Sequence, residues 1–396
     1  MKLVLMVVLA LSSLYGAKVV DVDERFQKSQ SCKACHMHIV KDWEKSWHSK
    51  SHYQSDEYYK ATIDYVSRKT RKSNNSVKVQ CATCHNPRIS VTSTGFDYEI
   101  DALMGLDKGS EVNKALESDA ISEGINCVVC HNIDKIHADK DKSKRGINRV
   151  EWTKSGHMSG PYTDAKSPYH KVEHRDFMDK ESDKLCFVCH ANDRAVGGLV
   201  FTNMEKEYKK SKQGCVDCHM GPKKMGIAAS LPIDNGKAKK RMIRSHKFEG
   251  AHISSMVEGS LDLKLQQKNR NIIITISNLQ PHNIPSGFGS RELLLELIYK
   301  KGTNVIDTKE ISFTRHYTSK RGKPTIPHLA VEATKDTSIP AKGKKVIKVV
   351  KDKEASSVEV RLHYRLVNDE VRNILKLKGK RWSEKTLVTS QTLNLK

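Results

Sequence analysis

Two stretches decide the fold of this chain: Cys186-Phe-Val-Cys189-His190 and, a little further on, Cys215-Val-Asp-Cys218-His219. Both read Cys-x-x-Cys-His, and the same pattern occurs at three earlier places. Those places are Cys32-Lys-Ala-Cys35-His36, Cys81-Ala-Thr-Cys84-His85 and Cys127-Val-Val-Cys130-His131. The chain has 10 cysteines, and the five motifs use all of them.

Each motif is the attachment signature of c-type haem, in which two thiols bond to the porphyrin and the next histidine ligates the iron. A zinc site would need four ligands from paired knuckles, which gives no reason for a histidine after every pair. A redox pair explains one Cys-x-x-Cys, and a disulfide framework would not repeat one spacing. We therefore predict five covalently bound haem c groups. Their proximal iron ligands are His36, His85, His131, His190 and His219.

The composition fits a chain whose interior is partly supplied by cofactor. Of 396 residues, 37% are hydrophobic and 6% aromatic, which is lean for a self-sufficient core. A porphyrin is a large apolar plate, so several of them would provide much of the buried surface. We expect that residues 18–252 do not fold compactly without haem.

The charge is strongly basic, with 69 Lys and Arg against 46 Asp and Glu. Part of this excess is expected to pair with haem propionates. The remainder favours an acidic redox partner, an anionic membrane face or a small oxyanion. Nucleic acid is excluded as a partner, because the lysines are scattered and no aromatic-basic module is visible.

The first 17 residues have the pattern of a secretory signal peptide: Lys2, then the apolar run Leu3–Leu11, then small residues. The apolar run is short for a membrane span. Export to a bacterial periplasm agrees with c-type haem, which is attached outside the cytoplasm. We expect a signal peptide over 1–17, a haem domain over 18–255 and a second domain over 256–396.

The second domain lacks cysteine and alternates apolar with polar residues. Period-2 runs separated by turn residues predict antiparallel strands, and about seven of them predict a β-sandwich. The expected fold is a mostly α, loop-rich multihaem domain followed by an all-β immunoglobulin-like sandwich. The runs are Leu261–Leu265, Ile272–Ile276, Leu293–Leu297, Val346–Val350, Val358–Leu362 and Leu387–Leu393.

Histidines are numerous enough to supply second axial ligands. The chain has 18, and nine non-motif histidines lie between His38 and His252. Trp43-x-x-Ser46-x-His48 is repeated as Trp152-x-x-Ser155-x-His157, which favours helices that deliver His48 and His157 to iron. The alternative is two surface helices that share a pattern by chance. Two histidine ligands per iron would give low potentials suited to electron transfer.

Several segments resemble the periplasmic multihaem cytochromes related to cytochrome c-554, which share haem packing with hydroxylamine oxidoreductase. The resemblance covers about residues 30–252. It rests on Trp43-x-x-Ser46-x-His48, Cys84-His85-Asn-Pro87, Glu123-Gly-Ile-Asn-Cys127, Ser167-Pro-Tyr-His170, Cys218-His219-Met220 and His246-x-Phe248-x-Gly250.

The resemblance implies electron transfer through closely stacked haems. The distal ligands it implies are His48, His157, His170 and His246, and His52 is a further candidate. The strand domain is similar to one appended to such cytochromes, in which a Gly-His-x-x-Pro-x-Gly segment follows the second strand. This chain has Pro281 in place of that Gly, so we carry no role over to His282.

We expect a periplasmic electron carrier between redox partners, such as a quinol-oxidising membrane complex and a terminal reductase. The alternative is a multihaem oxidoreductase in which one open haem acts on hydroxylamine, nitrite or sulfite. No Cys-x-x-Cys-Lys motif is present, and no residue is marked as catalytic. A third possibility is that the strand domain docks a partner.

Overall fold

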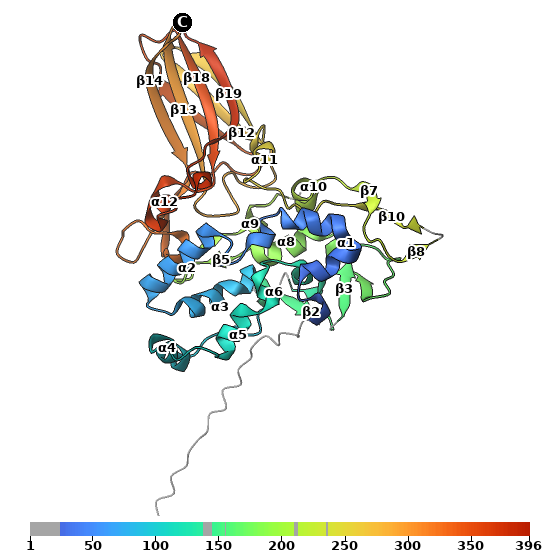
Figure 1. Ribbon diagram of the computed structural model, residues 1–396. Helices are drawn as coiled ribbons and strands as arrows, with labels where there is room; N and C mark the ends of the chain where they lie inside the picture. Colours follow the sequence, from blue (N-terminus) through green and yellow to red (C-terminus); the bar gives the residue numbers. More distant parts are fainter. Residues whose placement is uncertain (1–23, 138–144, 155, 210–212, 235–236) are drawn as a thin grey trace, which may run out of the picture.

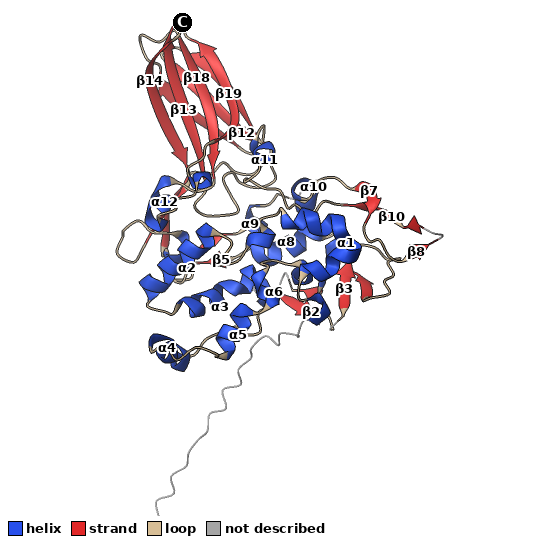
Figure 2. Cartoon of the chain, in the orientation of Figure 1, coloured by secondary structure: helices blue, strands red, loops and turns tan. Residues whose placement is uncertain are grey.

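The computed structural model describes residues 24–137, 145–154, 156–209, 213–234 and 237–396. Its helical N-terminal part and its C-terminal β-domain lie side by side, with the long strands rising from one edge of the helical part (Figures 1 and 2). The predicted signal peptide lies outside the described residues. The predicted division of the chain into a helical part and a strand part is confirmed.

Short helices make up the N-terminal part, as expected if helix–helix contacts do not fill its centre. They are α1 (Ser29–Glu44), α2 (Glu57–Thr70), α3 (Asn74–His85), α4 (Phe96–Leu103), α5 (Glu111–Glu117), α6 (Asp119–Ser122), α7 (Cys127–His131), α8 (Ser182–His190), α9 (Met204–Glu207), α10 (Cys215–His219) and α11 (Ser254–Val257).

Two-stranded ribbons connect these helices. β1 (Ile133–Ile136) pairs with β2 (Val150–Trp152), β3 (His157–Gly160) with β4 (Lys171–His174), and β5 (Asp193–Arg194) with β6 (Val200–Thr202). β7 (Lys224–Ile227) pairs with β10 (Lys240–Ile243), and β8 (Ile233–Asp234) with β9 (Lys237–Ala238).

Side-chain caps fix the starts of the longer helices. The Asp56 side chain accepts from the amide of Tyr59 at the start of α2, and Ser73 accepts from the amide of Ser76 at the start of α3. Each cap satisfies an amide that has no partner within the helix. α2 ends at Arg71, whose φ of 60° is the left-handed conformation that stops a helix.

The β-domain has two antiparallel sheets that share one hydrophobic core, and a separate two-stranded sheet of β15 (Arg315–Thr318) and β16 (Glu332–Asp336). One sheet has the order β11 (Leu261–Lys268), β12 (Asn271–Asn278), β17 (Lys344–Val350). The other has the order β14 (Asn304–Phe313), β13 (Glu292–Lys301), β18 (Ser357–Arg365), β19 (Thr386–Asn394). Alternate residues of β12 and β18 point into this core, which is the period-2 pattern of the sequence. The immunoglobulin-like topology stays a prediction.

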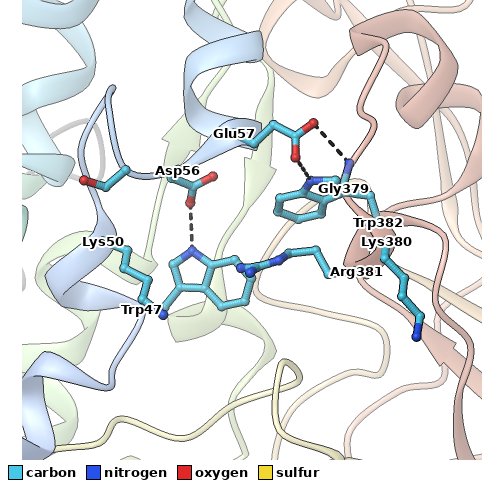
Figure 3. Close-up of a pocket in the computed structure, with 9 residues that line it drawn as sticks. Trp47, Lys50, Asp56, Glu57, Gly379, Lys380, Arg381 and Trp382 are labelled. Atoms are coloured by element: carbon cyan, nitrogen blue, oxygen red, sulfur yellow. Dashed lines mark hydrogen bonds between the residues drawn. The ribbon is translucent and has the colours of Figure 1, made fainter.

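A second core joins the two parts of the molecule. Apolar side chains of α2, among them Ile63 and Val66, pack with Val371, Leu375 and Trp382. The latter three belong to α12 (Asp369–Leu375) and to a 3-10 turn (Lys380–Trp382) that follows β18. Beside this core is a cleft of about 420 Å³ between Trp47, Asp56 and Glu57 on one side and residues 379–382 on the other (Figure 3).

Two local expectations differ from the structure. The segment Trp152–His157 does not form the expected helix. Trp152 ends β2 and pairs with Ile133, and His157 begins β3 and pairs with Lys171, so both residues lie in strands. The Lys-rich sequence of Met204–Lys212 predicts one helix, but the structure has only α9, four residues long, and residues 210–212 lie outside the described residues.

Candidate haem centres

Every motif stands at the end or at a break of a helix. α3, α7, α8 and α10 end at the motif residues His85, His131, His190 and His219. α1 continues past its motif but kinks at His36, with φ −108° and ψ 37°. The local conformation therefore presents two thiols from one helical turn and then turns the imidazole away from the helix axis, which suits one porphyrin per motif.

Four motif histidines each face a second histidine from a distant segment. Ring centroids are 6.4 Å apart for His36 and His170, and 6.3 Å apart for His48 and His190. They are 6.4 Å apart for His131 and His246, and also for His219 and His282. Two imidazoles that share an iron need about 2 Å from each nitrogen to the metal, which places their centroids about 6.3 Å apart. The residues present therefore fit a haem iron between each pair.

Backbone carbonyls orient the motif histidines. The Nδ1 atoms of His36, His131 and His219 donate to the carbonyls of Ala228, Ser159 and Glu249, at 2.8, 2.7 and 2.6 Å. A carbonyl only accepts, so Nδ1 carries the proton and the lone pair of Nε2 is free. This outer contact fixes both the tautomer and the ring orientation, as in other metal-ligating histidines.

The distal histidines are arranged similarly. Nδ1 of His246 donates to the carbonyl of Arg244 at 3.2 Å, and Nδ1 of His282 donates to that of Asn283 at 2.9 Å. Phe248 packs against both His48 and His246, with ring centroids 4.4 and 5.7 Å away, and it adopts a φ of 47°. Phe248, with its strained backbone conformation, therefore helps to position two distal histidine rings. The sequence pattern did not reveal this role.

Burial keeps these imidazoles neutral, which is the form that binds metal. Burial first, and then the positive charge of His190, lower the pKa of His48 to about 3. Burial likewise lowers the pKa of His190 and of His246 to about 4. The chain alone therefore prepares ligands that do not have to lose a proton at neutral pH.

The second motif differs from the other four. All 18 histidines lie in the described residues, yet none forms a facing pair with His85. Its Nδ1 is 2.7 Å from the Ser51 hydroxyl, and Tyr59 stacks on its ring at 4.3 Å. His328 is buried among Phe201 and Phe288, and its Nδ1 has no hydrogen-bond partner. His85 lies close enough to contribute, after burial, to lowering the pKa of His328 to about 3.

The structure places three of the five predicted distal ligands opposite a motif histidine and two elsewhere. His48, His170 and His246 each face a motif histidine. His157 instead has its Nδ1 2.9 Å from Glu173, and His52 has its Nδ1 3.3 Å from the amide of Gln54. Neither forms a facing pair with a motif histidine, so the geometry gives no support to their assignment as ligands.

His282 is the functional residue that sequence reasoning missed. It lies in the loop after β12 and faces His219, so the β-domain supplies one of the paired histidines. The signal was present in His282-x-x-Pro285-x-Gly287, but Pro281 replaces the glycine expected before it.

The cysteines show which motifs are neighbours. None of the ten is paired in a disulfide. Cys32 lies within hydrogen-bonding reach of Cys127, Cys84 of Cys189, and Cys186 of Cys215. Cys130 and Cys186 are also close enough to interact electrostatically. The first motif therefore adjoins the third, and the fourth adjoins the second, third and fifth.

Comparison with known proteins agrees with this arrangement. Residues 31–132 match the family described as cytochrome c554 and c-prime. A penta-heme cytochrome c552 from Thermochromatium tepidum has a similar fold, with a TM-score of 0.67 at 20% identity, over 93% of this chain and 98% of that one. A superoxide reductase in its oxidised state covers 35% of this chain at 10% identity, and its TM-score of 0.19 carries no argument. No curated protein sequence matches the chain.

The motifs, the matched family and the shared fold together define a multihaem c-type cytochrome with an appended C-terminal β-domain. The family match and the shared fold support covalently bound haem c and, in the broad sense, electron transfer. Within the described residues, no helix is both long enough and apolar enough to cross a membrane.

Proposed function

We propose that this chain is a periplasmic pentahaem cytochrome that passes electrons along five haems, four of them held by two histidines each. The observation that carries the proposal is the set of four facing histidine pairs, 6.3–6.4 Å apart, on four of the five motifs. An iron closed on both faces has no free position for a substrate, and it exchanges electrons with little change in its ligands.

The cysteine contacts support a branched order for the transfer. The haems of motifs one, three, four and five would form a line, and that of motif two would join it at motif four. The donor and acceptor remain proposals: a quinol-oxidising membrane complex on one side and a terminal reductase on the other.

The test is an electron paramagnetic resonance spectrum of the oxidised holoprotein, combined with a haem count by pyridine haemochrome. Five haems per chain with four low-spin signals are expected. Fewer than five haems, or two or more high-spin haems, would contradict the proposal.

The His85 centre favours a second candidate function: an oxidoreductase in which that one haem binds a small nitrogen or sulfur compound. The specific observation is the missing histidine partner. Repeating the spectrum with nitrite, hydroxylamine or sulfite tests it. Conversion of a high-spin signal by the added compound would support an open iron. A spectrum that none of the three compounds changes would contradict the second candidate function and leave electron transfer alone.

A further inference from the structure

The ribbon of β7 and β10 projects from the haem part of the molecule, at the opposite edge from α2 and α12 (Figure 1). Between Lys223 and Arg244 the sequence holds seven basic residues and one acidic residue. Some of these charges hold the ribbon in place. Arg241 and Lys239 bind Asp164, and Lys223 binds Asp179.

Three lysines of the same segment are exposed and form no ion pair within the described residues: Lys224, Lys237 and Lys240. They are the charges the ribbon presents to a partner.

An apolar surface lies beside them. β7 and β10 are antiparallel, with Met242 opposite Met225 and Lys240 opposite Ile227, so these four side chains share one face. Met225 is 64% exposed, Met242 46% and Ile227 42%. Methionine is flexible and polarisable, so paired methionines adapt to varied partner surfaces. Lys240 shares this apolar face, whereas Lys224, which is opposite Ile243, lies on the other face of the ribbon. An exposed apolar patch flanked by lysines is typical of a small, transient docking surface.

The base of the ribbon is attached to the first haem motif. The carbonyl of Ala228, one residue beyond β7, accepts from Nδ1 of His36 at 2.8 Å. The amide of Ser230 donates to the carbonyl of Cys35 at 2.9 Å. A protein held against the ribbon would therefore lie next to the haem at one end of the proposed line.

We propose that the β7–β10 ribbon is the docking surface for an acidic electron-transfer protein, which exchanges one electron with the haem of Cys32 and Cys35. Charge complementarity selects the occupant: three unpaired lysines attract carboxylates, while Met225, Met242 and Ile227 provide the desolvated centre. The inference rests on the proposed electron-transfer function and adds to it the site of exchange.

Flavodoxin hydroquinone, an acidic one-electron donor, is the probe. The anionic flavin hydroquinone loses one electron to become the neutral semiquinone, and that electron reduces one ferric haem to ferrous. Stopped-flow spectroscopy measures the second-order rate constant for reduction of the holoprotein by flavodoxin hydroquinone. Two triple variants are compared: K224E/K237E/K240E on the ribbon and K344E/K348E/K353E on the β-domain. The control triple makes the same change of net charge on exposed β-domain lysines.

The ribbon triple is expected to lower the rate constant about tenfold or more at low ionic strength, and the difference should fade at high salt. The β-domain triple should change it less than about twofold, since screening weakens distant charges. M225S/M242S should slow the reaction at all salt concentrations, compared with V346S/V350S on β17. Equal rates for the two charge triples would overturn the proposal.

Two further measurements separate the possible failures. Dithionite should reduce the haems equally in all variants. If dithionite cannot reduce the haems of the wild-type holoprotein, the proposed electron-transfer function is contradicted instead. Flotation with phosphatidylglycerol vesicles tests the lipid alternative. Binding to vesicles that depends on the ribbon, together with flavodoxin rates that do not, would assign the surface to anionic lipid and overturn the proposal.

Discussion

His282 is the side chain on which the arrangement of the last motif depends. Its ring stands 6.4 Å from that of His219, and its Nδ1 proton is engaged by Asn283. We expect H282A to convert one low-spin haem to high spin, seen by electron paramagnetic resonance, with the haem count unchanged. H157A is the matched control, because His157 is bound to Glu173 and faces no motif histidine. A low-spin spectrum in H282A would contradict the assignment.

His328 provides the complementary test at the His85 centre. It is buried near His85 but forms no facing ring pair with it. We expect H328L to leave the number of high-spin haems unchanged, because His328 is not the missing ligand. A new high-spin signal in H328L would mean that His328 binds the iron in the holoprotein, and the second candidate function would then fail.

These residues mark how far the sequence predicts the site. The cysteines and proximal histidines form a five-residue pattern that needs no tertiary information. The distal ligands come from elsewhere in the chain: His36 meets His170 and His131 meets His246. A lone histidine carries no sign of its partner, so the sequence could only count candidates. His282 could not be assigned because Pro281 replaces the glycine expected before it and because it lies beyond the haem domain.

The 3-10 turn Gly146–Arg149 packs so closely against α3 that its first residue has no room for a Cβ atom. Gly146 has a φ of +53°, and a Cβ there would lie 1.9 Å from the carbonyl oxygen of Thr83, inside the second motif. We expect G146A to destabilise the holoprotein by about 3 kcal/mol or more, from the clash and the backbone strain combined. Thermal denaturation followed at the haem absorption band measures the loss.

G198A is the control for this change. Gly198 also has a positive φ, of +90°, but a Cβ there would meet nothing within 4 Å. It isolates the backbone term, which is about 1–3 kcal/mol. Equal losses in the two variants would show that the contact with Thr83 is not the decisive one.

The contact between α2 and the turn after α12 depends on pH. Glu57 accepts from the indole of Trp382 at 2.7 Å and from the amide of Gly379 at 3.3 Å (Figure 3). It also accepts from the amide of Lys378 at 2.8 Å. Burial alone would raise the pKa of Glu57, but these hydrogen bonds outweigh it and leave the pKa below its ordinary value of 4.5. The stabilisation is therefore present above that value and is lost as the pH falls through the lower, folded-state pKa.

We expect E57Q to be less stable than the wild type near neutral pH, and the difference to vanish in acid. Thermal melts at a series of pH values measure it. E111Q, a change at an exposed carboxylate of α5, should show no such dependence. A gap between wild type and E57Q that stays constant into acid would rule out a role for the charge.

The strands and the repeat show why some elements could be predicted and others not. β11, β12, β13 and β18 follow from alternation over a single core, which is a local signal. The repeat at Trp152 predicted a helix, but pairing of Ile133 with Trp152 places this segment in a ribbon. Strand pairing between separate segments is not visible in a five-residue pattern.

At the scale of the whole molecule, the two parts differ in what holds them together. The β-domain has a continuous apolar core of its own. Among the described residues, the N-terminal part has smaller clusters, two of which also include side chains of the C-terminal part. We expect a chain with all ten cysteines changed to alanine to lose its N-terminal structure while residues 256–396 stay folded.

Limited proteolysis followed by mass spectrometry, with far-ultraviolet circular dichroism, measures this. A protected fragment that begins near residue 256 is expected, with β-type ellipticity. The haem-loaded wild type, cut under the same conditions, is the reference. Protection of the N-terminal part in the cysteine-free chain would mean that its side chains suffice as a core.

The pairing of His219 with His282 also has a meaning for biogenesis. Haem attachment needs only the motif at residues 215–219, but the second imidazole arrives with the loop after β12, once the first strands of the β-domain have formed. Maturation of the last centre is thereby timed by the folding of a different domain. A chain that is cut short or misfolds beyond residue 260 would retain its cofactor with one axial position vacant. A complete pair of histidines at this centre would therefore mark a chain whose β-domain has folded.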